Sequence, residues 1–320
     1  MIDYVTATTY NSKVTPYLGI CKLVNTYKNG LQCYHLEGCE LLEVQWNPLL
    51  RMLRVKGSLP YFFQGHNFGF PTSELIRCVD YIDGALGGVG LWGAHVECFE
   101  HGVILPVESS PKLFIANHEA VKGSRLKKSY NERHCGAFVM WSRRGEDLKM
   151  YDAGVNIKKK QGMERRKVIE DAGWNPNIDY LKFEARYRIP SLLNNGRVVL
   201  LEKLQNTEFL ELLSEDLLRQ YSLLHPARSL KMPVDKKDMN SLDSAIISFV
   251  EYGSNLGLSF QEIQKKIYRT INDAECLGKP DKDSRKAQIR KAFAKLEENE
   301  VSRWDMTELL KKALQDEKKS

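Results

Sequence analysis

The chain has 320 residues and a net charge of +6, and it is 42% hydrophobic and 28% charged. This length fits one large domain or two smaller ones, and the apolar content supports a packed core and excludes wholesale disorder. The seven cysteines are scattered and include no Cys-x-x-Cys pair, which argues against a structural zinc site.

The sequence shows neither a secretion signal nor a membrane span. Its N-terminus lacks a basic segment followed by an apolar run, and no uncharged apolar stretch is long enough to cross a bilayer. We therefore expect a soluble protein that stays in the cell that makes it and has no membrane partner.

The first two hundred residues contain the short alternating segments that are typical of strands. Strands or extended runs are expected at residues 2–10, 41–46, 50–56, 61–63, 94–106, 137–141, 148–151 and 181–189. Residues 72–81 have helical spacing instead, with Thr72 and Ser73 as N-cap candidates.

After about residue 207 the apolar residues follow helical spacing. Helices are expected at residues 208–224, 241–253, 259–268, 284–296 and 305–314, with a charged loop at 279–285. The predicted fold class is α+β, with an α/β domain over residues 1–200 and a helical domain over residues 201–320.

The motif Gln64-Gly65-His66-Asn67 directly follows an expected extended run. Gly65 lets the backbone turn and approach a ligand closely. His66 could bind a divalent metal or a phosphate, and Asn67 could orient a phosphate oxygen. The alternative is a histidine with a purely structural role.

Residues 95–102 place His95, Glu97, Glu100 and His101 in one expected strand. Strand alternation predicts Glu97 and both histidines on one face and Glu100 on the other. Because burying an unpaired carboxylate is costly, these acids indicate metal coordination or a catalytic cleft. The alternative is an edge strand that faces water.

Tyr151 stands at the end of an expected strand, close in sequence to Lys149 and to the basic run Lys158-Lys159-Lys160. Tyrosine can attack phosphorus when a metal polarises the phosphate and nearby cations lower the pKa of the hydroxyl. Residues 122–168 hold fourteen basic and five acidic residues, an excess that attracts phosphate backbones. The alternatives are a packing tyrosine and a solvated, lysine-rich surface.

Residues 181–189 alternate strictly, so that Lys182, Glu184, Arg186 and Arg188 share one face of a strand. One acid among three bases suits a metal or a phosphate. It suits a salt-bridged open surface equally well.

The order of these motifs resembles the gene II/X family of phage and plasmid replication proteins, best known from filamentous phages. The resemblance covers roughly residues 1–200. It rests on Met1-Ile2-Asp3, Lys56 and Ser58 before Gln64-Gly65-His66-Asn67, an acid within a strand, the strand ending in Tyr151, and Phe183-Glu184-Ala185-Arg186. It implies an antiparallel-sheet catalytic domain related to rolling-circle initiators.

The resemblance also implies a chemistry. Tyr151 would attack a DNA phosphate, form a covalent 5′-phosphotyrosyl bond and free a 3′-hydroxyl, which later reverses the reaction. The cofactor would be Mg²⁺ or Mn²⁺, with Glu100 as the favoured ligand, Glu97 kept open, and His66 as a further candidate. Glu184 would complete the metal shell or position a water. The expected DNA-binding residues are Asn67, Lys149, Lys158, Lys159, Lys160, Lys182 and Arg186.

The implied partners are single-stranded or supercoiled DNA at a replication origin and a host helicase, in the cytoplasm of a bacterial host cell. Two features depart from the family pattern. Ala153 stands where a lysine commonly follows the tyrosine, and no His-hydrophobic-His pair occurs. The alternatives are a non-catalytic DNA-binding replication regulator of the same fold and an RNA-binding or RNA-processing enzyme. The helical part could contact DNA, a helicase or another protomer, or only buttress the first domain.

Overall fold

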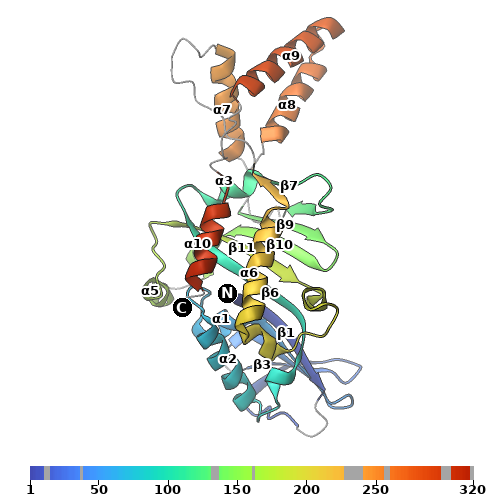
Figure 1. Cartoon of the computed structure of the whole chain (residues 1–320), viewed down its shortest axis with the longest axis vertical. Coiled ribbons are helices and arrows are strands. Elements are labelled where there is room, and N and C mark those ends of the chain that lie inside the picture. The colour runs from blue at the N-terminus through green and yellow to red at the C-terminus, as the bar shows by residue number, and fades with distance from the viewer. Residues whose placement is uncertain are drawn as a thin grey trace.

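The computed structural model describes residues 1–10, 15–36, 39–130, 137–160, 163–226, 241–255, 260–296 and 304–317. The fold is α+β, with one large antiparallel sheet in the N-terminal part and helices mostly in the C-terminal part (Figure 1). The ten strands of the sheet are β1 (Ile2–Tyr10), β2 (Cys21–Thr26), β3 (Gln32–Leu36), β4 (Cys39–Asn47), β5 (Met52–Ser58), β6 (His95–Val107), β8 (Lys127–Tyr130), β9 (Phe138–Arg143), β10 (Glu146–Asp152) and β11 (Asp179–Tyr187).

The strands lie in the order β2-β3-β4-β5-β1-β6-β11-β10-β9-β8, so that two hairpin-rich halves meet where β1, β6 and β11 pair. A second, two-stranded sheet joins β7 (His118–Ala120) to β12 (Leu224–Pro226). The order brings β10, β11, β6 and β1 side by side, although they come from distant parts of the sequence.

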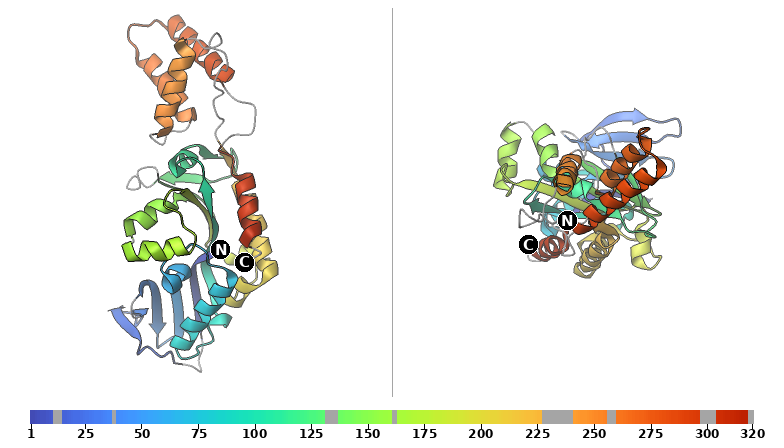
Figure 2. Two further views of the ribbon diagram at one scale, coloured as in Figure 1. Left: turned by 90° about the vertical axis from the view of Figure 1, so that its left-hand side faces the viewer. Right: turned by 90° about the horizontal axis from the view of Figure 1, so that it is seen from above.

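Helices and 3-10 turns surround the sheet. They are α1 (Leu59–Gln64), α2 (Thr72–Ala85), η1 (Leu91–Gly93), α3 (Pro111–Ala116), α4 (Ala153–Lys160), α5 (Met163–Asp171), η3 (Pro190–Asn194), η4 (Leu201–Gln205), α6 (Thr207–Tyr221), α7 (Ser241–Asn255), α8 (Phe260–Asp273), α9 (Lys279–Leu296) and α10 (Thr307–Glu317). Helices α6 and α10 lie on one side of the sheet, and α4 and α5 lie on the other (Figure 2).

The two faces of the sheet differ in chemistry, as β11 shows. Phe183, Ala185 and Tyr187 are buried in the main core, and the alternating Lys182 and Glu184 belong to the opposite, polar face. The apolar face is covered by α6 and α10, whose leucines join the same core. Strand alternation therefore gives one face that is buried in the main core and an opposite face that carries the charged residues together with a second, smaller apolar cluster under α4 and α5.

Helices α7, α8 and α9 form a separate unit beyond the end of the sheet (Figure 1). Its small core contains Ile246, Ile247, Ala292 and Phe293. By contrast, α6 and α10 contribute Leu213, Leu217, Leu310 and Leu314 to the main core. The boundary predicted near residue 200 stays a prediction, and the packing shows that elements on both sides of it share one core.

Most predicted segments are confirmed with ends that differ by at most five residues, and three details are wrong. The expected extended run at 61–63 is the middle of α1, where Pro60 supplies a residue suited to a first helical turn. The expected charged loop at 279–285 is the first half of α9, which also starts with a proline in its first turn. The third detail is the predicted alternation of faces along β6, which a bulge at Glu97 interrupts. Among the described residues, no helix is both long and apolar enough to cross a membrane.

Candidate functional site

A cluster of six side chains lies on the polar face where β1, β6, β11 and β10 meet. We call it the polar-face cluster; its members are Asp3, Glu100, Lys149, Tyr151, Lys182 and Glu184. The register explains the assembly, because Glu184 lies opposite Lys149 and Lys182 lies opposite Tyr151 in the β10–β11 pair. Four predicted site residues from β10 and β11 thus come together with Glu100 of β6.

Two lysines link the three acids of the cluster. The Lys149 ammonium donates to Glu184 Oε1 at 3.0 Å and to Glu100 Oε1. The Lys182 ammonium lies 2.8 Å from Glu184 Oε2 and also bonds Asp3. Lys182 is fully buried, which is tolerable because both its neighbours are carboxylates. Every acid in the cluster therefore contacts at least one ammonium group.

Tyr151 is held directly against this ion network. Its hydroxyl donates to Glu184 Oε2 at 3.4 Å, and Lys182 Nζ lies 5.6 Å from the centre of its ring. Burial and the negative charge of Glu184 raise the pKa of the Tyr151 hydroxyl well above its usual value, against the opposing effect of Lys182. The hydroxyl is consequently neutral in the free protein and needs a proton acceptor to react as a nucleophile.

The two glutamates titrate in opposite directions. Burial alone would raise the pKa of Glu184, but Lys182 and Lys149 outweigh burial and hold this pKa at about 2. Burial and the charge of Glu184 raise the pKa of Glu100 to about 7, in spite of Lys149. Two neighbouring carboxyl groups with separated pKa values form a pair in which one is ionised and the other can carry a proton near neutrality.

Arg186 borders the cluster and is its most exposed cation. Its Nε lies 3.6 Å from Glu100 Oε1 and donates to Cys98 Sγ, and its guanidinium stacks 5.2 Å over the Tyr4 ring. About a third of the Arg186 side chain is exposed, against almost none of Lys182. Of the predicted DNA-binding residues on this strand, Arg186 is thus the one that solvent can reach.

The structure separates Glu97 from Glu100 in an unexpected way. Val96 pairs with Ala7 and Cys98 pairs with Thr6, so that Glu97 is an extra residue in the ladder. This bulge turns Glu97 toward the polar face, where it bonds Thr8 and Arg54. The predicted opposite faces for the two acids are therefore wrong. Glu100, and not Glu97, belongs to the cluster around Tyr151.

The Gln64-Gly65-His66-Asn67 motif forms a self-contained loop after α1. Gly65 has a φ of 81°, as expected for a glycine that ends a helix, and Gln64 donates to the Phe68 carbonyl at 2.7 Å. The buried His66 accepts the Phe68 amide at Nδ1, and burial lowers the pKa of its ring. These contacts favour the structural interpretation of His66.

Asn67 is buried, and among the described residues no hydrogen bond joins it to the polar-face cluster. It lines a cavity of about 850 Å³ between the N-terminus, β6, α6 and α10, whose walls are mainly apolar. None of the six members of the polar-face cluster lines this cavity. The cluster and the cavity are therefore separate places in the molecule.

The remaining predicted residues are Lys158, Lys159 and Lys160. They form the C-terminal end of helix α4, which directly follows β10. Their side chains lie outside the described part of the structure. Conversely, Asp3 belongs to the cluster, although the sequence marks it only as part of the Met1-Ile2-Asp3 start. An isolated acid within the apolar β1 strand was the available signal, since a buried acid requires a partner.

The donor set of the cluster does not match a metal centre. Among the described residues, no three His, Cys, Asp or Glu side chains lie close enough together to hold a metal ion. The positions beside Glu100 and Glu184 are taken by the ammonium groups of Lys149 and Lys182. The Mg²⁺ or Mn²⁺ site stays a prediction.

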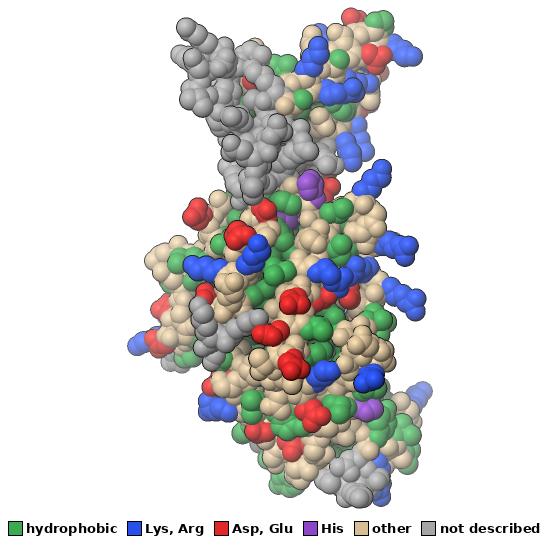
Figure 3. Space-filling model, viewed as in Figure 1, with side chains coloured by type: hydrophobic (Ala, Val, Ile, Leu, Met, Phe, Trp, Pro, Cys, Tyr) green, Lys and Arg blue, Asp and Glu red, His purple; other side chains and the backbone are tan. Residues whose placement is uncertain are grey.

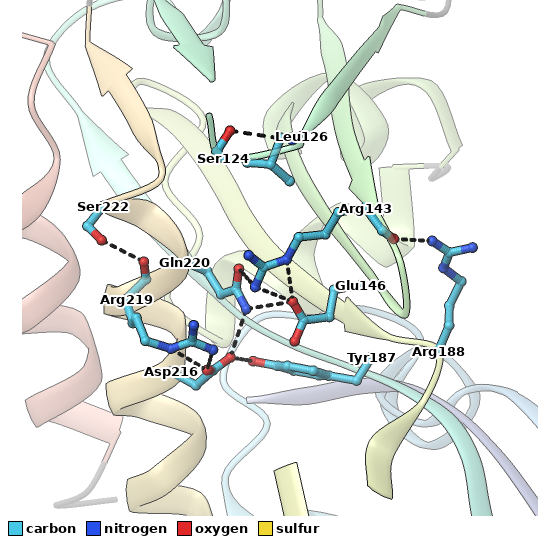
Figure 4. A network of polar contacts seen from close by, with 10 residues as sticks. All are labelled: Ser124, Leu126, Arg143, Glu146, Tyr187, Arg188, Asp216, Arg219, Gln220 and Ser222. Atoms are coloured by element: carbon cyan, nitrogen blue, oxygen red, sulfur yellow. Dashed lines mark hydrogen bonds and ion pairs between the residues drawn. The ribbon is translucent and has the colours of Figure 1, made fainter. Parts of the chain in front are cut away.

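A second polar network lies under α6 on the opposite face of the sheet (Figure 4). We call it the α6-face network; its members are Arg143, Glu146, Tyr187, Asp216 and Gln220. The Tyr187 hydroxyl donates to Asp216 Oδ2 at 2.8 Å, and Gln220 Nε2 donates to Glu146 Oε2 at 2.9 Å. These bonds fasten α6 to the β9–β10 turn and to β11.

Comparisons with known protein families, with curated proteins and with solved structures find no match to this chain.

Proposed function

We propose that the protein is a rolling-circle replication initiator that nicks and rejoins origin DNA through Tyr151. The observation that carries the proposal is the hydrogen bond from the Tyr151 hydroxyl to Glu184, inside a cluster that also holds two ammonium groups. A nucleophile beside a base that is itself oriented by a third group is the usual arrangement in covalent catalysis.

The reaction can be written with these side chains alone. The Tyr151 oxygen bonds to phosphorus, its proton passes to the Glu184 carboxylate, and the bond from phosphorus to the 3′-oxygen breaks. The departing oxygen takes a proton from Glu100, whose pKa of about 7 leaves this carboxyl partly protonated at neutral pH. Reversal of the same transfers reseals the strand.

Positive charge at the cluster would stabilise the transition state. Lys149 and Lys182 lie within the acid network, and Arg186 borders it at the exposed side. Fixed cations aimed at a reacting phosphate lower the barrier without reorganising during the reaction. The proposed substrate is single-stranded or supercoiled DNA at a replication origin.

The regulator alternative also has an observation in its favour. The raised pKa of Tyr151 keeps its hydroxyl neutral, as suits a side chain that only binds. A non-catalytic DNA-binding replication regulator would use the same charged face and omit the covalent step.

The test is a gel assay for covalent protein–DNA adducts. Wild type, Tyr151→Phe and Tyr187→Phe are each incubated with single-stranded DNA from the element that encodes the gene, with Mn²⁺ and with a chelator. We expect an adduct with wild type and Tyr187→Phe and none with Tyr151→Phe. Adduct from Tyr151→Phe would reject this nucleophile, and DNA binding without any adduct would establish the regulator. Loss of the adduct with the chelator would show that a metal takes part.

A further inference from the structure

The α7–α9 unit carries a surplus of positive charge that the proposed active site does not use. Residues 260–296, which span α8 and α9, contain ten basic and five acidic residues. Lysine and arginine side chains gather at this upper end of the molecule, away from the sheet (Figure 3). The unit has a core of its own, so this charge is presented by an independently packed element.

Helix α8 shows how the charge is displayed. Ile263 is buried and Ile267 packs against the core of the unit, whereas Lys265, Lys266 and Arg269 are exposed. None of these three cations takes part in an ion pair among the described residues. Lys149 and Lys182 differ, because each of them pairs with two carboxylates.

Helix α9 extends the same surface. Its exposed cations are Lys279, Arg285, Arg290 and Lys291. Lys282 donates to the Asn272 carbonyl near the end of α8, which ties the start of α9 to α8, and Lys286 lies 3.9 Å from Asp283 of its own helix. Helices α8 and α9 pack against each other, and both carry exposed cations.

The positions of exposed aromatic side chains indicate whether the basic surface suits single-stranded or double-stranded nucleic acid. Both large hydrophobic side chains that are exposed within α7–α9, Phe249 and Tyr252, belong to α7. The described part of α8 and α9 thus offers charge without an exposed stacking platform. Unpaired bases bind strongly through stacking, whereas a duplex is gripped through its phosphates.

We propose that the exposed cations of α8 and α9 bind the phosphate backbone of double-stranded DNA. This second contact lies beyond the end of the sheet and does not depend on cleavage by Tyr151. In a nicking protein, it would hold the duplex that flanks the opened strand.

The test compares two variants of the full chain with equal charge loss. One carries Lys265→Gln, Lys266→Gln and Arg269→Gln on α8, and the control carries Lys22→Gln, Lys28→Gln and Arg197→Gln, exposed residues of the sheet end. Binding of a labelled mixed-sequence duplex is measured by fluorescence anisotropy over a range of salt concentrations. A third variant with Lys279→Gln, Arg290→Gln and Lys291→Gln repeats the test on α9.

We expect the α8 variant to bind duplex more weakly, with a slope of log affinity against log salt that is smaller by about 2 to 3, roughly one unit per lost phosphate contact. The control should keep the wild-type slope. Unchanged slopes in both the α8 and α9 variants would overturn the proposal, as would an effect confined to single-stranded DNA or to anionic lipid vesicles. A smaller slope without any covalent adduct would support this contact while the proposed cleavage fails.

Discussion

The polar-face cluster and the α6-face network are built from similar parts and lie on opposite faces of one sheet. Each holds a tyrosine whose hydroxyl donates to a carboxylate, Tyr151 to Glu184 and Tyr187 to Asp216. The networks differ in their surroundings. Asp216 and Glu146 are satisfied by Gln220 and arginines beneath a helix, whereas the acids around Tyr151 compete for two lysines beside a reachable arginine.

This comparison teaches that a buried tyrosine–carboxylate pair is not by itself a sign of catalysis. The α6-face pair fastens a helix to the sheet, and the polar groups around it are paired by hydrogen bonds. The polar-face pair lies among acids whose pKa values are shifted in opposite directions, which is typical of reactive sites. Four predictions test whether the two clusters differ in this way.

The largest effect is expected when the carboxylate that accepts from Tyr151 is replaced, and little effect when the carboxylate that accepts from Tyr187 is replaced. Glu184→Gln should lower the rate of adduct formation by at least about 100-fold, because the proton acceptor for Tyr151 is lost. Asp216→Asn should leave that rate within about twofold of wild type. The rates are compared by quenched time courses with single-stranded DNA. Equal losses in the two variants would mean that the clusters do not differ in function.

The next effect concerns stability. Lys182→Met should lower the free energy of unfolding by about 3–5 kcal/mol, since Asp3 and Glu184 would remain buried with one partner fewer. Adding Asp3→Asn should restore part of this loss, because it removes one of the stranded charges. Chemical denaturation of both variants gives the values. A loss below about 1 kcal/mol for the single variant would contradict the tight ion network.

A pH dependence should come from Glu100. Its pKa is raised in the folded protein, so the folded state binds more protons than the unfolded state between about pH 4.5 and 7. Its contribution is fully present below the unfolded pKa and is lost as pH rises through the folded pKa. Relative to Glu100→Gln, wild type should lose on the order of 1–3 kcal/mol of stability between pH 5 and 8. Parallel stability curves for the two proteins would contradict the assignment.

The smallest effect is expected at the rim of the α6-face network. Arg219 pairs with Asp216, but its side chain is 57% exposed, and exposed pairs contribute little. Arg219→Ala should therefore change the free energy of unfolding by less than about 1 kcal/mol and leave adduct formation unchanged. Thermal melts and the adduct assay check both points. A larger destabilisation would show that the network depends on its exposed arginine.

Local patterns predicted much of the site because they depend only on neighbouring residues. The alternation of residues 181–189 placed Lys182, Glu184 and Arg186 together, and the strand-ending Tyr151 was recognised from its own segment. The partner of Lys182 could not be predicted from the sequence alone, because Asp3 is 179 residues away and meets it only through the order of strands.

Irregularities account for the other differences. The bulge at Glu97 inverts the face that strict alternation predicts, and a single extra residue leaves no clear mark in the sequence. At α9, a run of charges around Pro280 suggested a loop, yet proline is acceptable in a first helical turn. The separate packing of α7–α9 could not be predicted, because helical periodicity shows that a face is buried and not what buries it.

The way in which α7–α9 is connected has a consequence for synthesis on the ribosome. In chain order, α7–α9 come after β12 and before α10. Leu310 and Leu314 of α10 are buried in the main core, together with residues of the sheet. Chains fold from the N-terminus while they are made. Until α10 has been synthesised, the part of β6 that α10 contacts therefore stays uncovered. The basic helices α8 and α9 are synthesised before α10 and can fold first.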